Sequence, residues 1–367
     1  MTDVNGVGDP NRIQRDTDYR HADPPAVRKV VTPLPVPPED ASAASFGPLS
    51  APRRTSVATQ HAAFVEPAGP MTPSEIQIRM DTFRDAATAR FRVEGQDVRV
   101  AIAFRMTVDI GAERPIPATA TGWLAQERIV QANEGQLQAA TAKVGLRGEV
   151  GRLHEGRATP EIIRRVTQAL IDEGHLPPAS AAAPTLELRI RQLMFDHGIG
   201  MDCASYTRQS FLASRGERRG QTKLAPIENE DLSRLEKKGF AQVAIGDARP
   251  GDIVSFESLN PKEPGHRTIV YEAREATPEE LKALRTVLGF GIGRVTLLML
   301  DSSWGSSETF DHGGVERRAF WYCQDTKMWA SRDTAPDAKA AFEVRPEEDL
   351  YPGHRLIGAF RPSQEAR

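Results

Sequence analysis

One cysteine of this chain is placed where its chemistry could be used. Cys203 follows Gly198, Gly200 and Asp202, and the residues after it carry apolar side chains at helical spacing. The pattern predicts a helix that begins at or next to Cys203, where unpaired backbone N–H groups and the positive end of the helix dipole stabilise a thiolate. The same donors could hold an oxyanion that develops during attack on a carbonyl carbon. The alternative is a small buried cysteine without a catalytic role.

The segments around Cys203 predict the elements that would position it. Thr185 caps a helix that ends at Gly198, shortly before the cysteine. A second capped helix runs from Thr277 to the region of Leu288. Short strands are predicted at 253–256, 267–271, 295–300, 319–323 and 356–360. A helix-borne cysteine followed by a series of short strands indicates an α+β fold.

The sequence divides into three predicted parts. Residues 1–70 are rich in proline and lack helical or strand periodicity, which is typical of a disordered leader. This leader could act as a docking or export tail, or as a passive tether. Residues 71–184 predict an accessory α/β region with capped helices at Thr72 and Thr159 and one β-hairpin. Residues 185–367 form the region that carries the cysteine.

Length and composition limit the classes of function. The chain has 367 residues, a length typical of two folded domains. A net charge of −3 gives no electrostatic basis for binding nucleic acid or an anionic membrane. The two cysteines, Cys203 and Cys323, form no disulfide framework, and no Cys or His spacing is typical of zinc. No apolar run is long enough to span a bilayer, and the N-terminus lacks a standard secretion signal, so we expect a protein made in the cytoplasm.

Three short motifs follow one another in an order that is found in a known family. They are Met-Asp-Cys-Ala-Ser-Tyr at 201–206, Ala-Arg-Pro-Gly-Asp-Ile-Val-Ser-Phe at 248–256, and Gly-His-Arg-Thr-Ile-Val at 265–270. This order resembles that of NlpC-type, papain-like cysteine peptidases, in which an Asp-Cys motif precedes an Arg-Pro-Gly-Asp turn and a Gly-His strand. The segment 358–362 is similar to the last core strand of some members. The resemblance covers residues 185–362.

The resemblance implies a papain-like core in which the cysteine helix packs on an antiparallel sheet. Carried over to this chain, Cys203 is the nucleophile, and His266 is the general base that then protonates the leaving amine. Family members are mostly peptidoglycan hydrolases that cut amide bonds in the stem peptide, and this chemistry needs no metal or cofactor. We also expect Asp202, Ser205 and Gly265 to contact the substrate.

The third catalytic position departs from the family pattern. The residue that orients the histidine is usually His, Asn or Gln at the end of the following strand, and here that place holds Asp301. A carboxylate can accept the ring N–H and stabilise the imidazolium, so we predict that Asp301 orients His266. The alternatives are that Asp301 is a strand-end turn residue, or that His312 fills the position. Trp304 could line a substrate groove, although core packing is the usual role of a tryptophan.

Three classes of function follow from these patterns. The first is a cysteine amidase or endopeptidase acting on cell-wall peptides. Because no secretion signal is visible, we would expect a specialised secretion apparatus to deliver such an enzyme. The second is a catalytically inactive papain-like component that binds within a larger assembly through its N-terminal region. The third is a deamidase, transferase or protease that uses the thiol on protein substrates. Intact Cys203 and His266 favour the first class.

Overall fold

The computed structural model describes most of the chain after residue 70. The described residues are 29–30, 71–105, 121–216, 235, 239–259, 265–289, 292–305, 310–311, 313–332, 342–346 and 353–363. The predicted leader lies outside them, except for strand β1 (Lys29–Val30), which pairs with strand β10 (Phe342–Pro346). His312 also lies outside the described residues.

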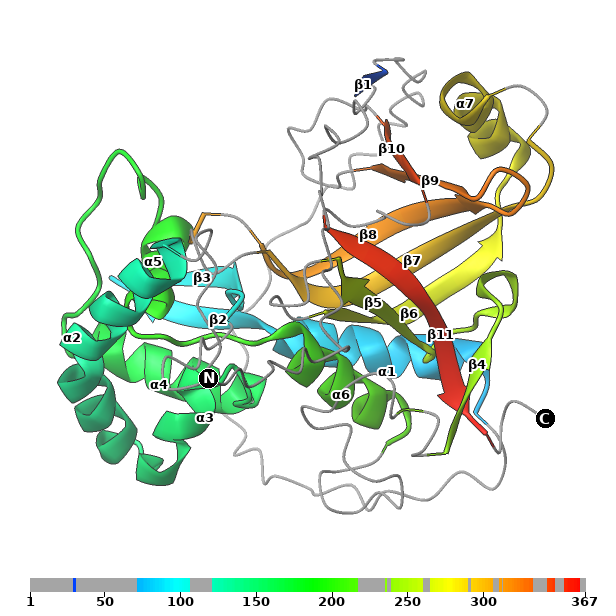
Figure 1. The fold of residues 1–367 in the computed structure, drawn as a ribbon. Helices are drawn as coiled ribbons and strands as arrows, with labels where there is room; N and C mark the ends of the chain where they lie inside the picture. Colours follow the sequence, from blue (N-terminus) through cyan, green and yellow to red (C-terminus); the bar gives the residue numbers. More distant parts are fainter. Residues whose placement is uncertain are drawn as a thin grey trace, which may run out of the picture.

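The described strands form one large sheet and one small hairpin (Figure 1). The strand order of the large sheet is β1-β10-β9-β8-β7-β6-β5-β11-β4, and every neighbouring pair is antiparallel. Its other strands are β4 (Phe240–Val243), β5 (Ile253–Ser258), β6 (His266–Glu275), β7 (Val295–Trp304), β8 (Gly314–Cys323), β9 (Met328–Arg332) and β11 (His354–Pro362). The hairpin consists of β2 (Thr88–Val93) and β3 (Gln96–Ala101). The fold is therefore mixed α+β with antiparallel sheets, as the sequence predicted.

The helices form groups around these sheets (Figure 1). They are α1 (Pro73–Ala86), α2 (Thr121–Lys143), α3 (Val150–His154), α4 (Pro160–Asp172), α5 (Leu186–Asp196), α6 (Cys203–Ser214) and α7 (Pro278–Leu288). Helices α2, α4 and α5 gather around the hairpin, whereas α1 and α6 lie side by side against the large sheet. Helix α7 packs on β9 and β10. Capping boxes at Thr72 and Thr277 explain where α1 and α7 begin, because each threonine side chain accepts from a backbone N–H of the first turn.

The central strands of the large sheet are buried on both faces, and the two faces differ in chemistry. On β6, Ile269 packs in one cluster with Tyr206 of α6, and we call this side the helix-covered face. The next residue, Val270, packs in another cluster, on the side that we call the aromatic face. The aromatic side chains of that second cluster are Phe256, Trp304, Phe320, Tyr322 and Trp329. Successive side chains of a strand point to opposite faces, so neighbours in the sequence lie in different cores.

The accessory region and the large sheet share one hydrophobic core. Met80 of α1 and Leu170 of α4 belong to the same buried cluster as Tyr206 of α6 and Ile269 of β6. The predicted boundary near residue 184 falls in the connection between α4 and α5. Because apolar side chains from both sides of that connection are buried together, we expect the two regions to fold cooperatively.

Candidate active site around Cys203

Cys203 is the first residue of α6, so the predicted helix start is confirmed. Asp202 is the N-cap residue, and its carboxylate accepts a hydrogen bond from the backbone N–H of Ser205. The turn before it needs glycine: Gly198 has a φ of 63°, and a side chain on Gly200 would overlap the backbone at Ala103. The sequence therefore places a cysteine at a capped helix N-terminus, at the end of a tight turn.

Backbone contacts with the accessory region cover the start of α6. Met201 forms a parallel bridge with Phe104, in which the Met201 N–H donates to the carbonyl of Ala103 at 3.0 Å. The Asp202 N–H donates to the carbonyl of Gly156, also at 3.0 Å. On the other side, the Ser303 hydroxyl of β7 donates to the Met201 carbonyl at 2.7 Å. The cysteine turn is thus held between the accessory region and the carboxyl end of β7.

The Cys203 thiol is buried, with only 8 % of the residue exposed. Burial, followed by the nearby Asp202 carboxylate, raises the pKa of Cys203 to about 12. The backbone N–H groups of Arg267 and Ala204 and the Arg267 guanidinium act in the opposite direction. Cys203 is therefore a protonated thiol at neutral pH in this arrangement. The sequence-based expectation of a stabilised thiolate is wrong for this state, because desolvation outweighs the helix N-terminus.

Two of the residues that we expected to contact the substrate form the helix cap. Burial raises the pKa of Asp202 to about 6, while the Ser205 N–H and the guanidinium groups of Arg157, Arg267 and Arg208 oppose this shift. The Ser205 hydroxyl accepts a hydrogen bond from the Gln209 side-chain amide at 2.9 Å. These contacts give Asp202 and Ser205 a structural role at the start of α6, and contact with a substrate stays a prediction.

His266 begins β6 as predicted, but its ring lies on the aromatic face. It pairs across the strands with Phe256, and its ring centroid lies 6.1 Å from that of Phe256 and 4.7 Å from that of Trp304. Burial, with smaller contributions from His354 and Arg318, lowers the pKa of His266 to about 3. The imidazole is thus neutral at physiological pH.

The structure does not bring the side chains of Cys203 and His266 together. The backbone N–H of Arg267, the next residue along β6, is bonded to the thiol, and the Arg267 guanidinium lowers the pKa of Cys203 electrostatically. His266 contacts the aromatic side chains on the other side of the same strand. The Cys203 thiol therefore lies next to the backbone of β6, whereas the imidazole of His266 points to the opposite face of that strand.

Asp301 lies on the helix-covered face, where it binds an arginine. It is paired with Ile269, and the Arg317 guanidinium donates to its two carboxylate oxygens at 2.6 and 2.9 Å. The same guanidinium donates to Asp81 of α1 at 2.8 Å and lies 3.1 Å from the ring centroid of Tyr271. Burial raises the pKa of Asp301, and Arg317 opposes that shift.

In this structure Asp301 therefore does not orient His266. Because side chains alternate along a strand, Asp301 shares the face of Ile269, and His266 has the opposite orientation. Asp301 instead joins β7 to β8 and α1 through Arg317. Arg317 was not predicted as part of the site, because it lies just before the predicted strand 319–323, whereas β8 begins at Gly314.

The last two predicted site residues have packing roles. A side chain on Gly265 would overlap the carbonyl oxygen of Phe256, so glycine lets β6 begin directly beside β5. Trp304 is fully buried, its indole N–H donates to the carbonyl of Glu316 at 3.0 Å, and the Arg318 guanidinium lies 4.7 Å from its ring centroid. Burial of Trp304 favours core packing over a groove-lining role.

Comparison with known proteins gives no match to a family model, a curated protein or a solved structure. The fold and the site together define an α+β protein in which a cysteine lies at the capped N-terminus of a helix, and that helix packs against an antiparallel sheet. Within the described ranges, no cluster of three or more His, Cys, Asp or Glu side chains could hold a metal ion. No helix of the described part is both long and apolar enough to cross a membrane.

Proposed function

We propose that the chain is a cysteine-dependent hydrolase of amide bonds with a papain-like core, and that its substrate is the peptide of peptidoglycan. The observation that carries the proposal is the placement of Cys203 at the first position of a capped helix, beside the strand that begins with His266. The order of the three NlpC-type motifs supports the same conclusion. The cell wall lies outside the cytoplasm, so the proposal includes export by a specialised secretion system.

In the proposed reaction the Cys203 sulfur attacks the carbonyl carbon of the scissile amide. The proton of the thiol passes to the imidazole of His266, which then gives it to the leaving amine as the thioester forms. Water hydrolyses the thioester and regenerates the thiol. The backbone N–H groups of Ala204 and Arg267 are bonded to the sulfur and would stabilise negative charge there, and the Arg267 guanidinium would add to this electrostatically.

This reaction requires His266 to reach the side of the strand where Arg267 lies. A shift of one residue exchanges the two faces of a strand, so a local change at the first residues of β6 would be sufficient. From Ile269 onward β6 is paired with β7, and Asp301 is fixed by Arg317 on that neighbouring strand. We therefore propose that the described arrangement is a resting state, and that substrate favours the rearranged start of β6.

The test is incubation of the full-length protein with purified peptidoglycan, followed by mass spectrometry of the released fragments. Wild type should release fragments cut within the stem peptide, and Cys203→Ala should release none. His266→Ala should also be inactive, whereas Cys323→Ser, at the other cysteine, should retain turnover per folded molecule. A second arm directs the protein to the bacterial periplasm, where wild type should lyse cells and Cys203→Ala should not. Equal release by wild type and Cys203→Ala would refute the proposal.

A second candidate function is a papain-like binding or structural component that does not react. The observation that favours it is the separation of the thiol and the imidazole onto different faces of β6, with both groups uncharged at neutral pH. This candidate predicts no fragment release from peptidoglycan by wild type. It also predicts that wild type and Cys203→Ala bind insoluble peptidoglycan, or an assembly partner, with equal affinity in a sedimentation assay.

A further inference from the structure

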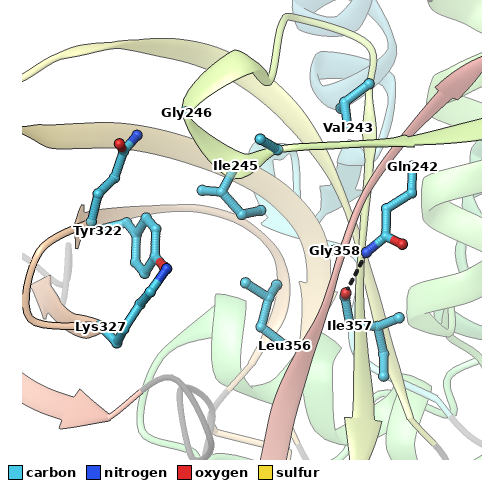
Figure 2. Close-up of a pocket in the computed structure, with 11 residues that line it drawn as sticks. Gln242, Val243, Ile245, Gly246, Tyr322, Lys327, Leu356, Ile357 and Gly358 are labelled. Carbon is cyan, nitrogen blue, oxygen red and sulfur yellow. Dashed lines mark hydrogen bonds between the residues drawn. The ribbon is translucent and has the colours of Figure 1, made fainter.

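A pocket of about 320 Å³ lies away from the cysteine turn, between two parts of the large sheet (Figure 2). One side is formed by β4, the short 3-10 helix Ile245–Asp247 and the first half of β11. The other side is formed by the end of β8 and its turn into β9. The two parts meet where Gly246 lies against the side-chain amide of Gln324.

The two walls of this pocket differ in polarity. Ile245 and Leu356 project between the two sides and give one wall an apolar surface (Figure 2). On the opposite wall the Lys327 ammonium donates to the Tyr322 hydroxyl at 3.1 Å. Of the described residues that line the pocket, Lys327 is the one with a charged side chain. The pocket thus places a cation and a phenol opposite an aliphatic surface.

The walls are held by contacts behind them. The Tyr322 ring packs on Trp329 with their centroids 4.6 Å apart, and Tyr322 belongs to the buried aromatic cluster. On the other side, the Gln242 side-chain amide donates to the carbonyl of Ile357 at 2.9 Å (Figure 2). A binding surface whose side chains are already fixed loses little conformational entropy when a ligand enters.

Lys327 has an unusual backbone conformation for its residue type. Its φ is 54°, in the left-handed region, where glycine is free of the steric cost that a Cβ introduces. Its position is the last of the turn between β8 and β9, which glycine would fill without strain. A lysine side chain is therefore present at a position where the backbone alone would favour glycine. Strain of this kind is a reason to look for a function of the side chain.

We propose that this pocket binds a small carboxylate that carries an adjoining apolar group, of the size of an N-acylated amino acid. An ammonium group and a phenol hydroxyl are suitable donors for a carboxylate, and the aliphatic wall would bury the apolar group. The volume is at the lower end of the range for small-molecule sites. The pocket borders the aromatic cluster rather than the helix-covered face, so the inference does not depend on chemistry at Cys203.

The test is a titration of the full-length protein with N-acetyl-L-leucine, followed by ligand-detected NMR and calorimetry. N-acetyl-L-leucine amide lacks the carboxylate, and acetate lacks the apolar group, so each removes one half of the proposed recognition. We expect each to bind at least about tenfold more weakly than N-acetyl-L-leucine, the ratio that corresponds to ~1.4 kcal/mol. Equal binding of the acid and its amide, or no binding of the acid at all, would overturn the proposal.

Three variants locate the binding. Lys327→Gly removes the ammonium and relieves the left-handed strain, so it should weaken binding about tenfold while the melting temperature stays equal or rises. Tyr322→Phe retains the packing on Trp329 and removes one donor, so it should weaken binding less. Lys282→Ala, an exposed lysine of α7 that does not line the pocket, is the matched control and should bind as wild type does. Unchanged affinity in Lys327→Gly would show that the ligand binds elsewhere.

Discussion

The first two residues of β6 point to opposite faces of the sheet and have different environments. On the helix-covered face, Arg267 lies beside the Cys203 thiol, and farther along Asp301 is bound by Arg317. On the aromatic face, His266 lies against Phe256 and Trp304. The helix-covered face therefore holds charged side chains that pair with each other. The aromatic face buries the His266 ring and favours its neutral form.

This comparison shows how burial controls the two groups that the proposed chemistry needs. A thiolate and an imidazolium stabilise each other only when they are adjacent, as in an activated cysteine–histidine pair. When the sheet separates them, desolvation acts on each group alone, raising the thiol pKa to about 12 and lowering the imidazole pKa to about 3. The same two residues are thus inert or reactive according to which face the histidine occupies.

The largest predicted effect concerns the reactivity of Cys203. A pKa that rises from 9.0 to about 12 lowers the thiolate fraction near neutral pH by about 10³ relative to an unperturbed thiol. Iodoacetamide should therefore modify Cys203 slowly in the absence of substrate, as measured by mass spectrometry of the peptide that contains it. Cys323, which is completely buried, is the internal control and should react more slowly still.

A fast reaction would be equally informative. If Cys203 is alkylated as fast as an exposed free thiol, the resting arrangement is not the one that dominates in solution, and His266 faces the cysteine there. If slow alkylation becomes fast on addition of peptidoglycan fragments, the rearrangement proposed for β6 is supported.

The second effect is the cost of removing Asp301 from its buried pair. Asp301→Ala removes the fully buried carboxylate from Arg317, which keeps its pair with the half-exposed Asp81, so we expect the free energy of unfolding to fall by about 3 kcal/mol, the lower end of the range for a broken buried pair. Glu257→Ala removes the carboxylate of an exposed pair with Arg355 and should cost less than about 1 kcal/mol. Urea denaturation of both variants measures the difference. If Asp301→Ala is as stable as wild type and loses only turnover, its role is catalytic orientation and the structural assignment is wrong.

Local signals in the sequence predicted much of the fold. The caps at Thr72, Thr159, Thr185 and Thr277 each begin a helix, and the Glu94–Gly95 turn joins β2 to β3. These elements are determined by side-chain oxygens and by backbone conformations that few residues adopt, so short segments are sufficient to recognise them.

Elements that depend on distant partners were missed. Helix α2 was not among the predicted helices, because its sequence has only weak helical periodicity, and strands β4, β9 and β10 were not predicted either. These strands are stabilised by pairing with segments far away in the sequence or at the edge of the sheet, which local propensity does not reveal.

The side of β6 that each residue occupies could not be predicted for a related reason. His266, Arg267, Thr268, Ile269 and Val270 are all buried. Alternation assigns a face when one side is polar and solvated, and here both sides are buried by different partners. The sequence therefore predicted the start of the strand at His266 but not the direction of its ring.

The third predicted effect is a dependence of the free energy of unfolding on pH that arises from His266. Its pKa is about 3 in the folded state and about 6.5 in an unfolded chain, so the stability it contributes is complete above pH ~6.5 and is lost as the pH falls toward the folded value. Between pH 6.5 and 5 this loss should reach about 2 kcal/mol. The raised pKa of Asp202 gives a contribution to stability that depends on pH in the opposite direction. This contribution is lost as the pH rises through about 6.

The comparison of wild type with His266→Gln isolates the histidine from Asp202. Unfolding free energies from denaturant titrations at pH 7, 6 and 5 should fall more steeply for wild type than for the variant. Parallel curves would mean that His266 is solvated or paired with an anion in solution, which would place its ring away from the aromatic face.

The smallest predicted effect tests the glycine that lets β6 begin beside β5. Gly265→Ala introduces a methyl group that would overlap the Phe256 carbonyl oxygen, and backbone does not yield as easily as a flexible side chain. We expect a loss of about 1–2 kcal/mol in unfolding free energy, typical of an overpacked site. Gly135→Ala is the matched control, because Gly135 lies in the interior of α2 with no atom near the added methyl group, and it should gain about 0.5–1 kcal/mol. Because the added methyl group displaces the residue before His266, Gly265→Ala should also change the alkylation rate of Cys203, whereas Gly135→Ala should leave it unchanged. If both alanine variants are stabilised equally, β6 does not begin against β5 in solution, and the face assigned to His266 loses its structural basis.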